Sequence, residues 1–102
     1  MIDAVTFEFE APLWLWDARK TDAWTFVSLP THVADEVLDL VGDSTRGFGS
    51  VRVEVTVGGT VWRTSIFPST ETYVLPVKKA VRRAEGLDVG DTVHVELALV
   101  DL

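Results

Sequence analysis

The chain has 102 residues, the size of one ordinary domain, and 47% of them are hydrophobic, which is enough to form a core without staples. It contains no cysteine, so a disulfide framework, a thiol nucleophile and a cysteine-based zinc site are all excluded. Sixteen acidic residues against nine basic ones give a net charge of −7. This balance disfavours generic nucleic-acid binding, because a phosphate backbone is held mainly by lysine and arginine.

Neither an export signal nor a membrane segment is visible, so we expect a cytoplasmic protein. The first residues lack the basic stretch of a signal peptide. No uncharged run approaches the roughly 20 apolar residues that a membrane helix needs. We treat residues 1–102 as one domain, since no linker or low-complexity tract divides them.

The chain opens with two predicted strands. Apolar and polar residues alternate over 5–10, and the bulky run 13–16 continues this strand beyond Pro12. A proline inside the run favours an edge position or a bulge. A polar turn over 17–22 then leads to a second strand over 24–29.

A helix is predicted next, which begins after the N-cap residue Thr31 and runs to Val41. Its apolar face has helical spacing and consists of Val33, Val37, Leu40 and Val41. Gly42 ends the helix and begins a loop that reaches Ser50.

The rest of the chain is predicted to form further strands around a second helix. A strand over 51–57, a Gly58-Gly59 hairpin turn and a return strand over 60–67 come first. A short strand over 72–75 follows, and then a helix from Pro76 to Glu85, because proline is favoured at the first helical position. Gly86 ends the helix, and the alternating run 93–99 predicts a closing strand.

The two halves share their landmarks. Leu29-Pro30 and Leu75-Pro76 lie 46 positions apart, and Gly42-Asp43 and Gly90-Asp91 lie 48 positions apart. A duplicated strand–helix–strand unit predicts a pseudo-two-fold, mainly β protein.

Several segments carry a family resemblance. The run from Leu75 to Val93 resembles the core of the swapped-hairpin barrels, among them the AbrB and MazE transcription factors. The chain as a whole resembles the bacterial domain-of-unknown-function family 1905, through WTFVSLP (24–30), GTVWRTS (59–65), YVLPVKKAVR (73–82) and VGDTVHV (89–95). The resemblance implies a small closed β-barrel of about six to eight strands with two short helices. It implies no established activity.

Four cations form the candidate ligand-binding surface. These cations are Lys78, Lys79, Arg82 and Arg83. On a helix with about 100° per residue they lie on the side opposite the apolar residues. One interpretation is a site for an anionic small molecule or an acidic protein, completed by Arg63 and by the aromatic Trp62 or Tyr73. The other is a solvated helix face whose cations complement the helix dipole.

The corresponding face of the first helix carries Asp35, Glu36 and Asp39 instead of cations. This asymmetry argues against DNA binding, the alternative that the likeness to AbrB raises, because such proteins use cations from both halves. A stripe of Arg52, Arg63 and Lys78 would be the DNA surface in that case. Because one helix is acidic and the other is basic, we expect the chain to be a monomer or to form a weak homodimer.

The tryptophans leave three interpretations open. Trp14, Trp16, Trp24 and Trp62 fill the barrel core, form a dimer interface or line a small-molecule pocket. We expect the first.

No catalytic constellation is visible, so we expect neither an enzyme nor a cofactor. His32 and His94 stand alone without metal-ligand spacing, so no metal site is predicted. No serine has a nucleophile elbow, and the glycine-rich loop after Gly42 lacks the strand and helix that flank a dinucleotide loop.

Overall fold

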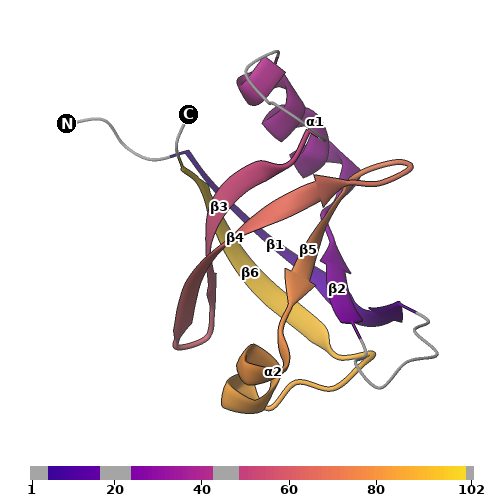
Figure 1. The fold of residues 1–102 in the computed structure, drawn as a ribbon, viewed down its shortest axis with the longest axis vertical. Helices are drawn as coiled ribbons and strands as arrows, with labels where there is room; N and C mark the ends of the chain where they lie inside the picture. Colours follow the sequence, from indigo (N-terminus) through magenta and orange to yellow (C-terminus); the bar gives the residue numbers. More distant parts are fainter. Residues whose placement is uncertain (1–4, 17–23, 43–48, 101–102) are drawn as a thin grey trace.

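A computed structural model describes residues 5–16, 24–42 and 49–100. These residues form a closed antiparallel barrel with one short helix at each end (Figure 1). The strands are β1 (Thr6–Trp16), β2 (Trp24–Ser28), β3 (Val51–Val57), β4 (Thr60–Pro68), β5 (Tyr73–Val77) and β6 (Thr92–Leu99), and the helices are α1 (Thr31–Val41) and α2 (Lys79–Glu85). The predicted fold class is confirmed. Neither helix of this described part is long and apolar enough to cross a membrane.

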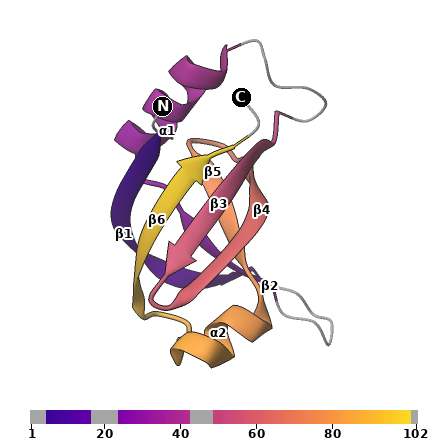
Figure 2. The ribbon, with the colours of Figure 1, turned by 90° about the vertical axis from the view of Figure 1, so that its left-hand side faces the viewer.

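The strand order shows the internal symmetry. Around the barrel the strands run β1-β2-β5-β4-β3-β6. When β1, β2 and β3 exchange places with β4, β5 and β6, the same cyclic order results. The two helices then exchange as well, and Figure 2 shows α1 and α2 at opposite ends of the barrel. Duplication of one unit therefore accounts for the whole topology.

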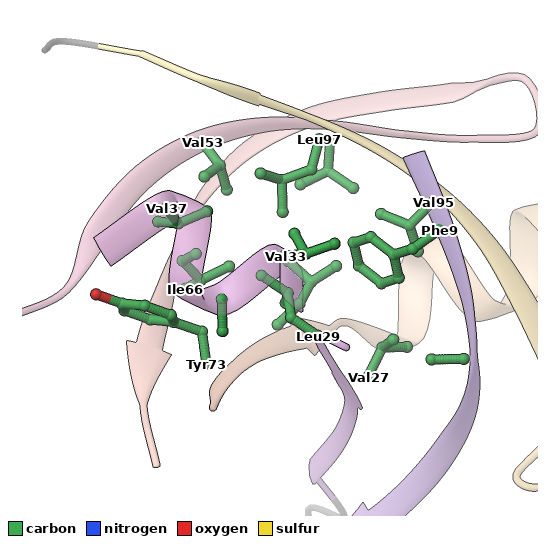
Figure 3. Packing of buried hydrophobic residues seen from close by; sticks show 14 of the residues in the cluster. Phe9, Val27, Leu29, Val33, Val37, Val53, Ile66, Tyr73, Val95 and Leu97 are labelled. Atoms are coloured by element: carbon green, nitrogen blue, oxygen red, sulfur yellow. The ribbon is translucent and has the colours of Figure 1, made fainter. Parts of the chain in front are cut away.

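The core fills the inside of the barrel. Strands β1, β2, β3 and β6 alternate between buried and more exposed residues, and directly opposed residues of neighbouring strands share a face. Val53, Val55 and Leu97 are fully buried in this way, and Val33 and Val37 of α1 close one end (Figure 3). Each such side chain contributes about 1.5–3 kcal/mol relative to an exposed position, so the alternating pattern is the main determinant of the barrel.

The two strand–helix junctions are held by reciprocal hydrogen bonds. The hydroxyl of Thr25 in β2 donates to the carbonyl of Val77, just before α2, at 2.6 Å. The hydroxyl of Thr72, just before β5, donates to the carbonyl of Leu29, just before α1, at 2.7 Å. Each half therefore ties down the start of the other half's helix.

The two Leu-Pro pairs do not hold equivalent positions relative to the helices that follow them. Pro30 is the N-cap residue of α1, with φ −56° and ψ 145°, whereas the N-cap residue of α2 is Lys78, with φ −73° and ψ 157°. Pro76 lies inside β5, opposite Phe26, so the prediction that it begins the helix is wrong. Pairing with β2 keeps Pro76 extended, and α2 begins at Lys79.

The first helix needs two corrections. Thr31 lies inside α1 and makes no capping hydrogen bond, because the preceding residue takes the N-cap place. Leu40 is 50% exposed, and Ala34 is buried in its stead. Gly42 ends α1 as predicted, with φ 47° and its N–H donating to the carbonyl of Leu38.

The predicted interruption at Pro12 is a change of partner. β1 pairs with β6 as far as Pro12, which lies opposite Thr92, and with β2 from Leu13 onward. The N–H of Leu13 donates to the carbonyl of Asp91 at 2.9 Å. Pro12, which has no backbone N–H to donate, therefore lies where β1 passes from pairing with β6 to pairing with β2.

Candidate functional site

The predicted cations lie on α2, which covers the end of the barrel opposite α1 (Figure 2). β5 runs through the extended residue Lys78 into the helix, and Gly86 ends it in the left-handed conformation. Val81 is the buried residue of α2, and Leu87 packs against the core just after the helix. One apolar contact on each side of Gly86 thus holds the helix to the barrel and turns its other side to solvent.

Four of the six arginines and lysines in the described part of the chain lie on α2 and its N-cap residue. Lys78, Lys79 and Arg83 are exposed, and Arg82 is half-buried. Within the described residues no carboxylate forms an ion pair with any of the four. The Nε atom of Arg82 is buried and has no hydrogen-bond partner there either. The described part of the chain therefore does not neutralise the cluster.

The acidic residue of α2 faces away from these cations. Glu85 accepts a hydrogen bond of 2.6 Å from the hydroxyl of Thr60, at the start of β4. Its carboxylate lies so close to the β3–β4 turn that a Cβ atom on Gly58 would clash with Oε1 of Glu85. Gly58 also has φ +57°, which favours glycine. Glu85 therefore anchors α2 to the hairpin.

A surface hollow of about 310 Å³ lies beside the helix. Its lining residues are Lys79, Arg82, Arg83, Gly86, Leu87 and Asp88. Three cations face one carboxylate in this group, and Leu87 supplies an apolar side chain. The hollow can therefore hold an anion of modest size, with charge-assisted hydrogen bonds from the two guanidinium groups.

The structure does not bring Arg63 to this hollow. Arg63 lies on the outer face of β4, opposite Glu54 of β3, and its Nε atom is 3.3 Å from a carboxylate oxygen of that residue. Both side chains are exposed, so the pair contributes little to stability. It does supply Arg63 with a partner that the α2 cations lack.

Trp62 and Tyr73 are also separated from the basic surface. Trp62 faces the barrel interior, because it lies opposite the buried Val55, and its Nε1 atom is buried without a partner in the described residues. Tyr73 is buried near α1, in the group that also contains Val37 (Figure 3). Burial raises the pKa of the Tyr73 phenol above its usual value of 10.0. Neither aromatic residue lines the hollow.

Three tryptophans lie outside the barrel. Trp16 and Trp24 face each other across β1 and β2 and are 55% and 56% exposed, and Trp14 is half-buried opposite Phe26. The expectation that tryptophans fill the core is therefore wrong for these three. Valine, leucine and isoleucine fill most of the interior, and Trp62 packs against them from one end. We call Trp14, Trp16, Trp24 and Phe26 the aromatic face.

His94 is exposed, but it does not stand alone as predicted. Its Nε2 atom is 2.7 Å from a carboxylate oxygen of Glu8, and its Nδ1 atom is 3.5 Å from one of Glu10. The hydrogen bond to Glu8 is the main cause that raises the pKa of His94 above 6.5. The glutamates lie far away in sequence, and the β1–β6 register, which pairs His94 with Glu10, brings them together.

The sequence model of a domain of unknown function, DUF1905, matches residues 9–97. The chain belongs to the DUF1905 family. The match covers all six strands in whole or in part and both helices, so the predicted resemblance to family 1905 is confirmed. No curated protein matches the sequence significantly. Membership in DUF1905 carries no assigned activity, and the function has to be argued from this chain's own surfaces.

Proposed function

We propose that this DUF1905 chain is a small binding module that recognises an anionic ligand or an acidic protein segment through α2. The observation that supports it is the cluster of Lys78, Lys79, Arg82 and Arg83, which has no ion-pair partner among the described residues. In a protein of net charge −7, such a cluster is a local exception to the overall charge. It attracts anions that the rest of the surface repels.

The helix dipole explains only half of this cluster. Arg82 and Arg83 lie in the last turn, where cations are stabilised by the carbonyl end of the helix. Lys78 and Lys79 lie at the opposite end, where the dipole disfavours a positive charge, and the first turn contains no acidic residue. Two cations at an unfavourable position favour a binding role over mere complementation of the dipole.

The test is an NMR titration with inorganic phosphate and with an acidic peptide at millimolar concentration. We expect the amide signals of α2 and of Leu87 to shift, and the shifts to shrink in the variant Arg82→Glu/Arg83→Glu. The matched control is Arg52→Glu, which changes an exposed cation on β3, outside the cluster. If neither probe moves the α2 signals, or if the control weakens binding equally, the proposal is wrong.

DNA binding is the competing role for the same cations. It predicts a mobility shift of duplex DNA that falls steeply with salt, because bound phosphates release counterions. The acidic residues Asp35, Glu36 and Asp39 lie on α1, the pseudo-symmetric counterpart of α2. A duplex shift that the α2 variant abolishes would replace the first proposal with this one.

A further inference from the structure

The aromatic face is a continuous apolar surface on the outside of β1 and β2. The ring centroids of Trp14 and Phe26 are 5.2 Å apart, and those of Trp24 and Phe26 are 6.4 Å apart with an interplanar angle of 16°. The indole N–H of Trp14 donates to the hydroxyl of Ser28 at 3.0 Å, which fixes that ring. Trp16 and Trp24 remain more than half exposed, although burying an aromatic ring is strongly favourable.

The β2–β5 register brings a cation of α2 to the edge of this face. Thr25 lies opposite Val77, and both side chains are buried inside the barrel. Lys78 keeps the extended conformation, so its exposed side chain lies on the outer face, as that of Trp24 does. The β2–β5 ladder ends at the pair of Thr25 and Val77, and the next residue beyond it is Trp24 on one side and Lys78 on the other. Figures 1 and 2 both show that β2 begins at the end of the barrel that α2 covers.

We propose that the aromatic face and the adjoining cations bind a nucleotide, with the base stacked on Trp24 and the phosphate held by Lys78 and Lys79. This inference rests on the proposed function, since it names the anion that α2 binds. The complementarity is double. An exposed indole offers a π-face to a flat ring, and the ammonium group of Lys78, which has no ion-pair partner among the described residues, offers a charge to the phosphate.

A purely apolar partner fits this surface less well. It would leave the ammonium group of Lys78 desolvated beside the interface, with no described carboxylate to neutralise it. A bare phosphate, in turn, would leave Trp16 and Trp24 exposed to water. A ligand that joins a ring to a phosphate uses both parts of the surface.

The experiment compares AMP, adenosine and inorganic phosphate in NMR titrations of the indole N–H signals and the α2 amides. We expect AMP to shift the indole signals of Trp16 and Trp24 and the amide of Lys78. Adenosine should bind at least about fivefold more weakly, because it lacks the charge. Phosphate should leave the indole signals in place.

Variants separate the ring from the charge. Trp24→Leu should weaken AMP binding about tenfold, whereas Trp24→Phe, which keeps a ring, should retain most of it. Lys78→Glu should weaken AMP binding and leave adenosine unchanged, and Arg52→Glu should change neither.

Four outcomes overturn one idea or the other. Equal affinities of AMP and phosphate for α2, with unmoved indoles, would refute the nucleotide and keep the anion site. Equal binding of AMP and adenosine, unaffected by Lys78→Glu, would refute the nucleotide, because the cations then take no part in binding it, and the titrations with phosphate and the acidic peptide would decide the proposed function separately. If AMP shifts no signal, the nucleotide is refuted, and the acidic peptide alone decides the role of α2. If the indole signals of Trp16 and Trp24 instead depend on protein concentration without AMP, the aromatic face binds a second copy of the chain and not a nucleotide.

Discussion

The hydrogen bond from Thr25 to Val77 should be worth more to the free energy of unfolding than an ordinary threonine contact. Thr25 is 2% exposed, and its hydroxyl donates at 2.6 Å to the last carbonyl of β5. Thr25→Val keeps the shape and the β-branched side chain, so it removes little besides the hydroxyl. A buried carbonyl then loses a partner, which costs about 1–2 kcal/mol. In a domain of this length that lowers the melting temperature by about 5–15 °C.

Urea unfolding, followed by tryptophan fluorescence, measures this free energy. Thr72→Val removes the pseudo-symmetric bond to Leu29, which is only partly buried, so its cost should be smaller, about 0.5–1 kcal/mol. Thr56→Val, on a half-buried position of β3 with no side-chain hydrogen bond in the described residues, is the control and should stay within about 0.5 kcal/mol of the parent. If Thr25→Val matches this control, the view that reciprocal hydroxyls hold the two junctions is refuted.

Three further predictions concern the turn, the first helix and the outer surface. Gly58→Ala should cost about 1–3 kcal/mol, because φ is +57° and the new Cβ atom would meet a carboxylate, whereas Gly59→Ala meets nothing within 4 Å and should cost less; thermal unfolding compares them. Val37→Ala should cost about 2 kcal/mol and Leu40→Ala under about 1, although leucine is larger, because only the valine is fully buried; equal losses in urea unfolding would contradict this. NMR should give His94 a pKa above 6.5, so its contribution to stability is complete below pH 6.5 and is lost as the pH rises through the folded-state pKa; a value at or below 6.5 would show that its glutamate partners do not act on it.

Period-two alternation was the most reliable signal in the sequence. Strands β3 and β6 repeat valine or leucine at every second position, and such a pattern has one solution, in which that side faces the core. The first helix was less certain in detail. Leu40 has helical spacing, but it is half exposed, and α1 packs against the core through the smaller Ala34 instead.

Only part of the candidate site could be predicted from the sequence. The cations of α2 are so close in the sequence that helical geometry alone places them on one side of the helix. The predicted surface also included Arg63, Trp62 and Tyr73, because they are near the cations in the sequence or in the predicted order of strands. The pairings of β4 and β5 place each of the three residues away from the cations of α2. The aromatic face was missed because alternation says which residues share a side of a strand, but not which side is the inside. That choice was made by Leu13, Val27 and Thr25, which are buried on the opposite side.

Local sequence by itself determined the strands, both hairpin glycines, the glycines that end the two helices and the duplication. Each depends on interactions within a few residues or on a repeated pattern. The tertiary structure alone decided which ring or charge stands beside which. The contacts of His94 with Glu8, of Thr25 with Val77 and of Glu85 with Thr60 each join distant parts of the chain. Closure of the barrel sets their register, and closure depends on all six strands at once.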